Sequence, residues 1–374
     1  MKKRNSLVVL LVVLLFLVLG PFQASASPGR LAALGLTNGT SWMLGYDEGY
    51  FFLNPAALQK LQPQIWGDLT TTDAGLLLNF GNKVNAYLVA GLPITQNFTG
   101  IPVTTPVMSP LANQLAQVGV GFAVGNIDIG VSAFTGFKSY TDANNNNSDF
   151  VVGANGGAII PFGQNLSLDA AGGVTFWSIQ RHPVPTNDYV ATPLDFSALA
   201  RLNWVLAQNN TLHIYGRFAY TNRGYSLAGT NTAVSNIDLV AGASDEMTIT
   251  EGVLIFAGAY LDASSTSTTT VAGTYTIVGN AGGELSLSKE VVARLGLAEN
   301  FEVINTNTAT NVTTVGGTST ALSGGVGLNF GNLTFDAEAD VALFTDGPNF
   351  ISGANTAPWT LELSATYYFA KAAK

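Results

Sequence analysis

The chain has 374 residues, of which 10% are charged, compared with about 25% in an average soluble domain, while 47% are hydrophobic and 41 are glycine. Its net charge of −9 argues against a nucleic-acid partner, because phosphate backbones attract basic surfaces. Beyond the N-terminus no apolar run is long enough for a membrane helix, so the high apolar content is typical of a protein that crosses a membrane with strands.

The first 26 residues have the parts of a secretory signal peptide. A Lys-Lys-Arg stretch at residues 2–4 precedes an apolar run at 7–19, and Ala-Ser-Ala at 24–26 offers a small-x-small cleavage site. The alternative, a membrane anchor helix, would need a longer apolar run and no cleavage site. We therefore predict that residues 1–26 are a cleaved signal peptide, and their removal leaves a net charge of −12.

Residues 27–62 lack the alternation that follows them and form a segment of their own. They contain small and aromatic residues, and a short helix start at which Asn precedes Pro. The segment is too small to fold alone, so we expect it to pack inside a barrel as a plug; the alternative is that it lies aside in the periplasm. The candidate plug residues are Asp47, Glu48, Asn54, Pro55 and Ala56.

From residue 63 to 369, apolar and polar residues alternate, which predicts an all-β fold: a transmembrane antiparallel up-and-down β-barrel of about 14–16 strands. Short turns alternate with longer polar stretches, as expected for a barrel with its short turns in the periplasm. A soluble all-β protein would not leave an uncharged face on nearly every strand. The expected strands include 192–207, 211–225, 234–245 and 248–262.

The stretch 321–344 shows the two faces of the barrel wall most clearly. A Gly-Asn turn at 331–332 joins two alternating runs, and the second run carries Asp336, Glu338 and Asp340 on one face and no charge on the other. Three acids in a row cannot lie in a protein core, because burying unpaired carboxylates costs too much free energy. We expect the uncharged face to meet lipid and the acids to line a wet lumen.

In the final strand, 357–369, every second residue is apolar or aromatic and is expected to face outward. The strand ends on aromatic residues, like the C-terminal signal of bacterial barrels. Residues 370–374 follow it as a tail. We expect three partners: outer-membrane lipid, the barrel assembly machinery through this last strand, and a small-molecule solute. The expected location is the outer membrane of a Gram-negative bacterium.

The N-terminal segment also resembles a known family. The run FFLNPAAL at 51–58 follows a Gly- and Ala-rich lead at 31–35 and lies just before the first strand, as in the FadL-type outer-membrane transporters of fatty acids and hydrocarbons, which it resembles. The resemblance implies that Asn54, Pro55 and Ala56 belong to a hatch that plugs the lumen, and that the barrel passes hydrophobic molecules inward. The loop at 93–112 is shorter and richer in proline than the corresponding loop of that family.

The lumen is expected to carry charge on two opposite sides once the apolar faces are assigned to lipid. The basic wall would consist of Arg181, Arg201, His213, Arg217 and Arg223, and the acidic wall of Asp336, Glu338, Asp340 and Glu362. Walls of opposite sign would set a transverse field across a pore and orient polar solutes. The alternative is that Arg201 or Arg217 pairs with Asp47 or Glu48 of the plug.

These features predict an outer-membrane channel for passive uptake of small molecules, hydrophobic ones if the family resemblance extends to the solute. Two alternatives remain: an open general-diffusion porin with a charged constriction, and a structural or assembly-partner barrel whose lumen is filled. The sequence has no catalytic constellation, metal-ligand spacing or cofactor fingerprint. We therefore expect no enzymatic activity, no metal site and no cofactor.

Overall fold

The structure is a computed structural model that describes residues 28–34, 36, 40–46, 48–68, 74–81, 83–90, 114–141, 145–183, 189–222, 225–227, 230–232, 234–267, 271–307, 312–314, 318–345 and 360–369. The predicted signal peptide, the C-terminal tail and the loop at 93–112 lie outside these residues.

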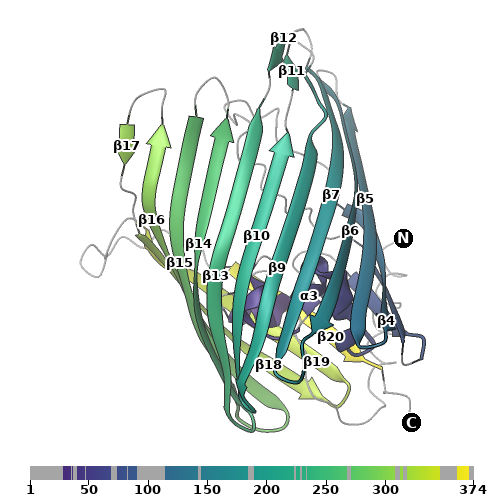
Figure 1. The fold of residues 1–374 in the computed structure, drawn as a ribbon, viewed down its shortest axis with the longest axis vertical. Coiled ribbons are helices and arrows are strands. Elements are labelled where there is room, and N and C mark those ends of the chain that lie inside the picture. The colour runs from purple at the N-terminus through teal and green to yellow at the C-terminus, as the bar shows by residue number, and fades with distance from the viewer. Residues whose placement is uncertain are drawn as a thin grey trace, which may run out of the picture.

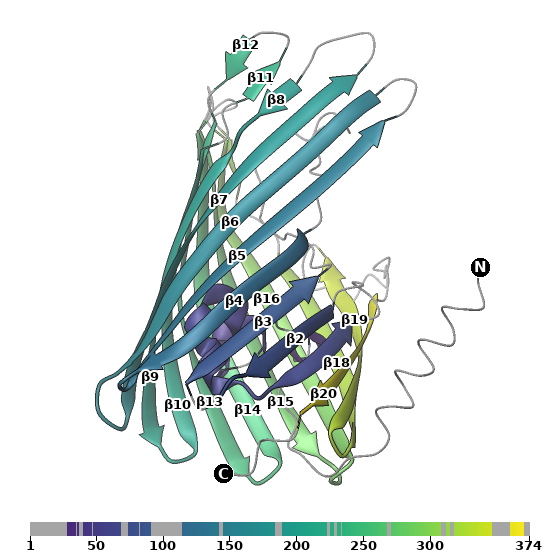
Figure 2. The ribbon, with the colours of Figure 1, turned by 90° about the vertical axis from the view of Figure 1, so that its right-hand side faces the viewer.

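Sixteen of the described strands close into one antiparallel ring (Figures 1 and 2). They are β1 (Gln64–Asp68), β2 (Ala74–Asn79), β3 (Val84–Ala90), β4 (Gln114–Val124), β5 (Ile127–Thr141), β6 (Asn145–Pro161), β7 (Leu166–Pro183), β9 (Leu194–Ala207), β10 (Asn210–Asn222), β13 (Ser235–Thr250), β14 (Val253–Ser267), β15 (Val271–Ser286), β16 (Val291–Asn307), β18 (Thr318–Phe330), β19 (Leu333–Thr345) and β20 (Thr360–Tyr368). Each pairs with its neighbours along the chain, and β1 also pairs with β20, which closes the ring. The predicted all-β barrel is therefore confirmed.

Four short strands extend the pairing beyond the ends of the long ones: β8 (Tyr189–Ala191), β11 (Tyr225–Leu227), β12 (Thr230–Thr232) and β17 (Val312–Thr314). The ring is uneven in its pairing. Among the described residues β1 and β20 share five paired positions, whereas β6 and β7 share seventeen. The seam between the first and last strands is therefore a short stretch of the wall.

The short turns lie at one end of the barrel, because every second connection of an up-and-down barrel falls at the same end. Gly125, Gly252 and Gly331 adopt positive φ in these turns, with values of 65, 85 and 68°. The expected strand boundaries near residue 246 are wrong: β13 continues to Thr250 and turns at Gly252. Alternation runs unbroken through this stretch, so it does not reveal where the turn falls.

The outward faces of the strands are apolar and exposed. Phe176, Phe196, Trp204, Phe218 and Leu297 are between 40 and 48% exposed. Exposed aromatic and aliphatic side chains on neighbouring strands of a closed barrel form the band that contacts lipid in a membrane.

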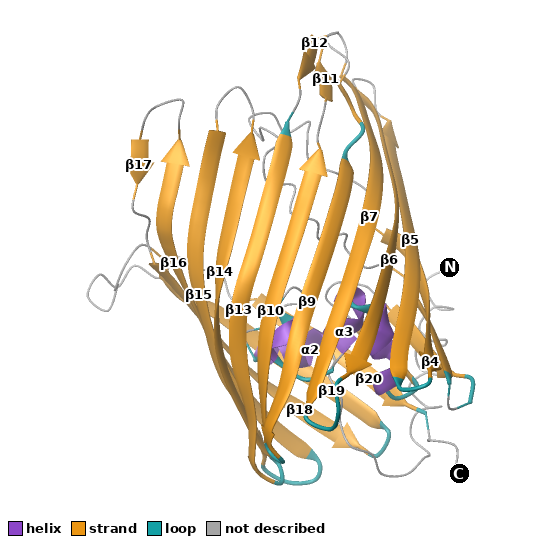
Figure 3. Ribbon diagram, in the orientation of Figure 1, coloured by secondary structure: helices purple, strands orange, loops and turns teal. Residues whose placement is uncertain are grey.

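Four short helices lie inside the ring (Figure 3): α2 (Pro28–Ala33), η1 (Ser41–Met43), α3 (Glu48–Leu53) and η2 (Pro55–Lys60). We call the described residues from 28 to 61 the plug. The helix α2 packs on β16 and β18–β20, η1 on β10, β13 and β14, and η2 on β3–β6.

The hydrophobic core of the molecule is the interface between plug and wall. Leu34, Trp42 and Leu58 of the plug are at most 2% exposed and pack with buried wall residues such as Trp66 and Leu77. Apolar burial therefore takes place inside the barrel, on the side away from lipid. No helix in the described part of the chain is long and apolar enough to span a membrane.

Candidate functional site

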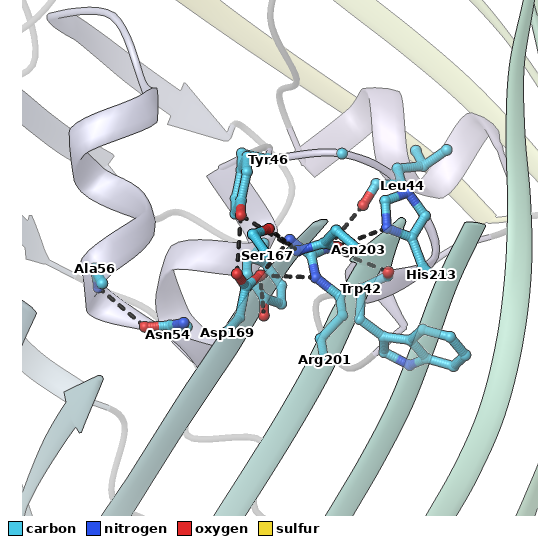
Figure 4. A network of polar contacts seen from close by, with 12 residues as sticks. Trp42, Leu44, Tyr46, Asn54, Ala56, Ser167, Asp169, Arg201, Asn203 and His213 are labelled. Atoms are coloured by element: carbon cyan, nitrogen blue, oxygen red, sulfur yellow. Dashed lines mark hydrogen bonds and ion pairs between the residues drawn. The ribbon is translucent and has the colours of Figure 1, made fainter. Parts of the chain in front are cut away.

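A buried ion pair of the wall holds the backbone of the plug (Figure 4). Arg201 on β9 and Asp169 on β7 are directly opposite in the sheet, and both are fully buried. The Nε and Nη2 atoms of Arg201 lie 2.9 and 2.8 Å from Oδ2 of Asp169. Its Nη1 donates to the carbonyl oxygens of Trp42 at 3.2 Å and Leu44 at 2.8 Å. The pair is thus satisfied on both sides, as a buried charge requires.

Two plug tyrosines complete the surroundings of this pair. The hydroxyls of Tyr46 and Tyr50 donate to Asp169 at 2.9 and 3.0 Å. The guanidinium of Arg201 lies over their rings, 3.6 Å from the centroid of Tyr50 and 4.9 Å from that of Tyr46. Burial raises the pKa of both phenols, so they remain protonated donors to the carboxylate.

A second polar chain holds the turn that follows η1. His213 Nδ1 lies 2.8 Å from Oδ1 of Asn203, whose amide donates to the hydroxyl of Tyr46 at 3.3 Å. On the other side of the ring, His213 Nε2 lies 3.5 Å from Glu246, which accepts a hydrogen bond from the backbone N–H of Gly45. The wall thus binds the backbone of Trp42, Leu44 and Gly45 as well as the side chain of Tyr46.

The indole of Trp42 fits a notch between two wall tyrosines. It stacks on Tyr215, with centroids 4.5 Å apart and planes 5° apart, and meets the ring of Tyr260 edge-on at 6.1 Å. Gly242 lies between these tyrosines in the sheet, opposite both of them. A Cβ at Gly242 would come within 2.4 Å of the Cβ of Tyr260, so the close spacing requires glycine.

The Asn54-Pro55-Ala56 motif occupies a seat formed by wall glycines. Oδ1 of Asn54 accepts from the N–H of Ala56 at 3.1 Å and caps η2, while its amide donates to the wall carbonyl of Ala158 at 3.4 Å. A Cβ at Gly130 would meet the carbonyl carbon of Pro55 at 2.2 Å. Because the backbones approach this closely, the wall and the motif fit each other only with glycine on the wall.

Helix α2, the first helix of the plug, takes part in a chain of charged residues on the side of the lumen opposite Arg201. Arg30 bonds to Glu284 of β15, which also lies 3.5 Å from Nε of Arg294 on β16. Arg294 Nη1 in turn contacts Oδ1 of Asp336 on β19 at 2.5 Å. The hydroxyl of Ser323 donates to the carbonyl of Ala33 at 3.3 Å. Charged contacts therefore hold both ends of the plug, and Lys60 at its C-terminal end lies 2.7 Å from Asp128.

The predicted wall residues are placed as follows. Arg201 and His213 are buried on the lumen face, Arg217 pairs with Asp238 at 3.3 Å, and Asp336 and Glu338 are buried on β19. Arg181, Asp340 and Glu362 lie in strands, but their side chains are outside the described part of the structure, as is the side chain of Glu48. Asp47 and Arg223 also fall outside it.

This placement corrects the expectation of two facing walls with opposite charge. Acids and bases alternate locally around the lumen, because Asp169 lies beside Arg201 and Arg294 lies beside Asp336. The expected contact of Arg201 with the plug exists, but it reaches the carbonyls of Trp42 and Leu44, and its carboxylate partner is on the wall.

The sequence reasoning missed the partners that neutralise these residues: Asp169, Asp238, Glu246, Glu284 and Arg294. Each occupies an inward position of its strand. The alternation of inward and outward residues along the strands could therefore have identified them as facing the lumen. Among the described residues, no group of three or more His, Asp or Glu side chains could hold a metal ion.

No protein-family model matches the chain, and no curated protein matches it. Solved structures do match. A Pseudomonas aeruginosa FadL homologue is 14% identical over 94% of this chain and 100% of that chain, with a TM-score of 0.48. The Pseudomonas putida toluene transporter TodX is 8% identical over 93% of this chain and 99% of that chain, with a TM-score of 0.45.

CdiB from Escherichia coli is 11% identical over 82% of this chain, with a TM-score of 0.50, and the match spans 62% of the CdiB chain. This match concerns the barrel fold alone.

Proposed function

We propose that this chain is an outer-membrane channel through which small solutes diffuse passively, and that its plug is the gate. The observation that carries the proposal is the placement of the plug across the lumen of a 16-strand ring. Barrels of this strand number are wide enough for an aqueous channel. A solute can therefore cross only where the plug yields.

The way the plug is held supports a gate that moves without opening the wall. The sixteen strands pair with one another and none of them pairs with a plug segment, so the ring stays closed if the plug leaves its seat. The polar contacts that hold the plug include the bonds of Arg201 to the carbonyl oxygens of Trp42 and Leu44 and the Arg30–Glu284 pair, which water can replace.

A disulfide that can be opened and closed tests the gate. A Cβ at Gly325 would lie 2.6 Å from the Cβ of Ala33 and 2.7 Å from the carbonyl oxygen of Ala337. Disulfides need about 3.5–4.5 Å between Cβ atoms, so a shift of about 1 Å in both α2 and β18 brings the pair Ala33→Cys and Gly325→Cys into range. The natural chain has no cysteine, so no other bridge can form. In proteoliposomes, the oxidised double variant should exclude small sugars and the reduced form should admit them, with each single variant unaffected by oxidation.

Equal entry before and after reduction would refute the gate. The density of bonds at the Arg201 seat favours a second candidate, a structural barrel whose filled lumen passes nothing. Exclusion of every solute by the wild type and by both redox states of the double variant would favour that candidate.

A further inference from the structure

Three charged side chains lie on the lumen wall directly beyond the plug. Arg217 on β10 and Asp262 on β14 both lie opposite Val240 of β13, and Asp238 lies two residues farther along β13 on the same face. Tyr215 and Tyr260, which hold Trp42 of the plug, precede Arg217 and Asp262 by two residues toward the short turns. The charged cluster therefore lies about 7 Å farther along the strands from the short turns than the notch that holds Trp42.

The cluster contains two acids and one base. Arg217 Nη2 lies 3.3 Å from Oδ2 of Asp238, and Asp262 interacts with both residues. The side chains of Arg217 and Asp238 are 24 and 15% exposed, and Asp262 is also part-exposed, so the cluster faces the lumen. Two carboxylates beside one guanidinium leave one negative charge without a partner in the cluster, and this charge attracts a cation.

The basic groups at plug level are already matched by acids in the described residues: Arg201 by Asp169, Arg294 by Asp336, Arg30 by Glu284 and Lys60 by Asp128. Beyond the plug, Arg217 matches one of the two acids of the cluster, so Asp238 and Asp262 together leave one negative charge on this part of the wall.

Aromatic and hydrogen-bonding groups accompany the acids. The ring of Tyr260 is part-exposed, and aromatic faces attract organic cations. Tyr215 is 3% exposed, and its hydroxyl has no hydrogen-bond partner among the described residues; the same is true of the buried Nε of Arg217. Buried polar groups are normally satisfied, so unpartnered ones beside a charged cluster point to a polar ligand.

We propose that Asp238 and Asp262 make the lumen beyond the plug selective for organic cations. The ammonium group of such a solute lies between the two carboxylates, and its apolar part lies against Tyr260. This inference rests on the proposed channel function, in which the same surface is the last one a solute meets before the gate. Asp262 is the specificity-determining residue, because Asp238 already has Arg217 as a partner.

Three probes that share a phenyl ring on a two-carbon chain test the selectivity: 2-phenylethylammonium, 2-phenylethanol and 3-phenylpropanoate. Calorimetric titration of the full chain in detergent micelles should give about tenfold tighter binding of the ammonium than of the alcohol, and the weakest binding of the carboxylate. Asp262→Asn should remove the preference, and Asp238→Asn with Asp262→Asn should reverse it in favour of the carboxylate. Asp262→Glu should retain it and shows that the site tolerates substitution.

Asp245→Asn is the matched control. Asp245 is on β13 as well, but its position alternates with the lumen-facing Ser244 and Glu246, so the substitution changes total charge without changing the lumen. Equal binding of the three probes, no binding of any probe, an intact preference in Asp262→Asn, or the same loss in Asp245→Asn would overturn the proposal. Binding does not require passage, so this result and that of the cross-linked gate are independent.

Discussion

Replacing Arg201 with methionine should loosen the plug by several kcal/mol. Methionine keeps the apolar stem but removes every contact of the guanidinium with Asp169 and with the carbonyls of Trp42 and Leu44. A buried charge that loses its partner costs about 3–5 kcal/mol. Asp169 keeps two phenol donors, so we expect the lower value, about 3 kcal/mol. With about 1.4 kcal/mol per factor of ten, the equilibrium for undocking should rise about 100-fold.

The rate at which a buried thiol reacts measures this equilibrium. Ser41 is fully buried beside Trp42, and Ser41→Cys places a single thiol in a chain that has none. In this background Arg201→Met should raise the rate of maleimide modification about 100-fold, because only the undocked form reacts. Adding Asp169→Asn should recover part of the loss, since no lone charge then remains buried.

Arg217→Gln provides the control, because Arg217 lies on the neighbouring strand and pairs with Asp238 of the wall. Its thiol reactivity should match that of the parent. A rise below about tenfold in Arg201→Met, or an equal rise in Arg217→Gln, would refute the reasoning that the buried pair holds the plug.

Three further predictions concern the seat, its ionisation and the outer wall. Gly130→Ala should displace η2, since the new Cβ would meet Pro55, and limited proteolysis should then cleave the plug; Gly156→Ala, whose Cβ would meet nothing within 3.8 Å, should stay resistant. Burial raises the pKa of Tyr46 and Tyr50 above 10.0, so docking of the plug should keep its full strength below pH 10 and weaken above it. The phenolate absorbance of these two residues can be obtained by subtracting the titration of their Phe variants, and a midpoint at pH 10 would contradict this prediction. Leu297→Arg should destabilise the barrel by about 2–4 kcal/mol in lipid vesicles, as urea titration can measure, and an unchanged midpoint would argue against a lipid-facing position.

The barrel and its two faces follow from the sequence because alternation has a period of two and the apolar set is uniform. Phe196 and Trp204 are exposed where the pattern places them outward, and Arg201 and Asn203 are buried between them. Local patterns also suffice for the cap that Asn54 makes on η2. These features depend on neighbours within a few residues.

The pairing of inward side chains with one another could not be read in the same way. Parity says that Asp169 and Arg201 face inward, but their contact depends on how far β7 and β9 are shifted against each other, which the long connection between them sets. The partners of the plug depend in addition on where a segment without periodicity comes to rest. The expectation of opposed charged walls left out inward residues of the other sign on each side: Asp169 and Asp238 beside the arginines, and Arg294 beside Asp336.

The short seam between β1 and β20 gives the plug a mechanical consequence. Five paired positions join the ends of the wall, while η2 grips β3–β6 on one side of this joint and α2 grips β18–β20 on the other. The plug thus bridges the seam at which the barrel closes. Since α2 can find its seat only after the last strands are in place, a docked plug marks a barrel whose assembly is complete, and an undocked plug leaves the ring held at its joint by those few backbone bonds.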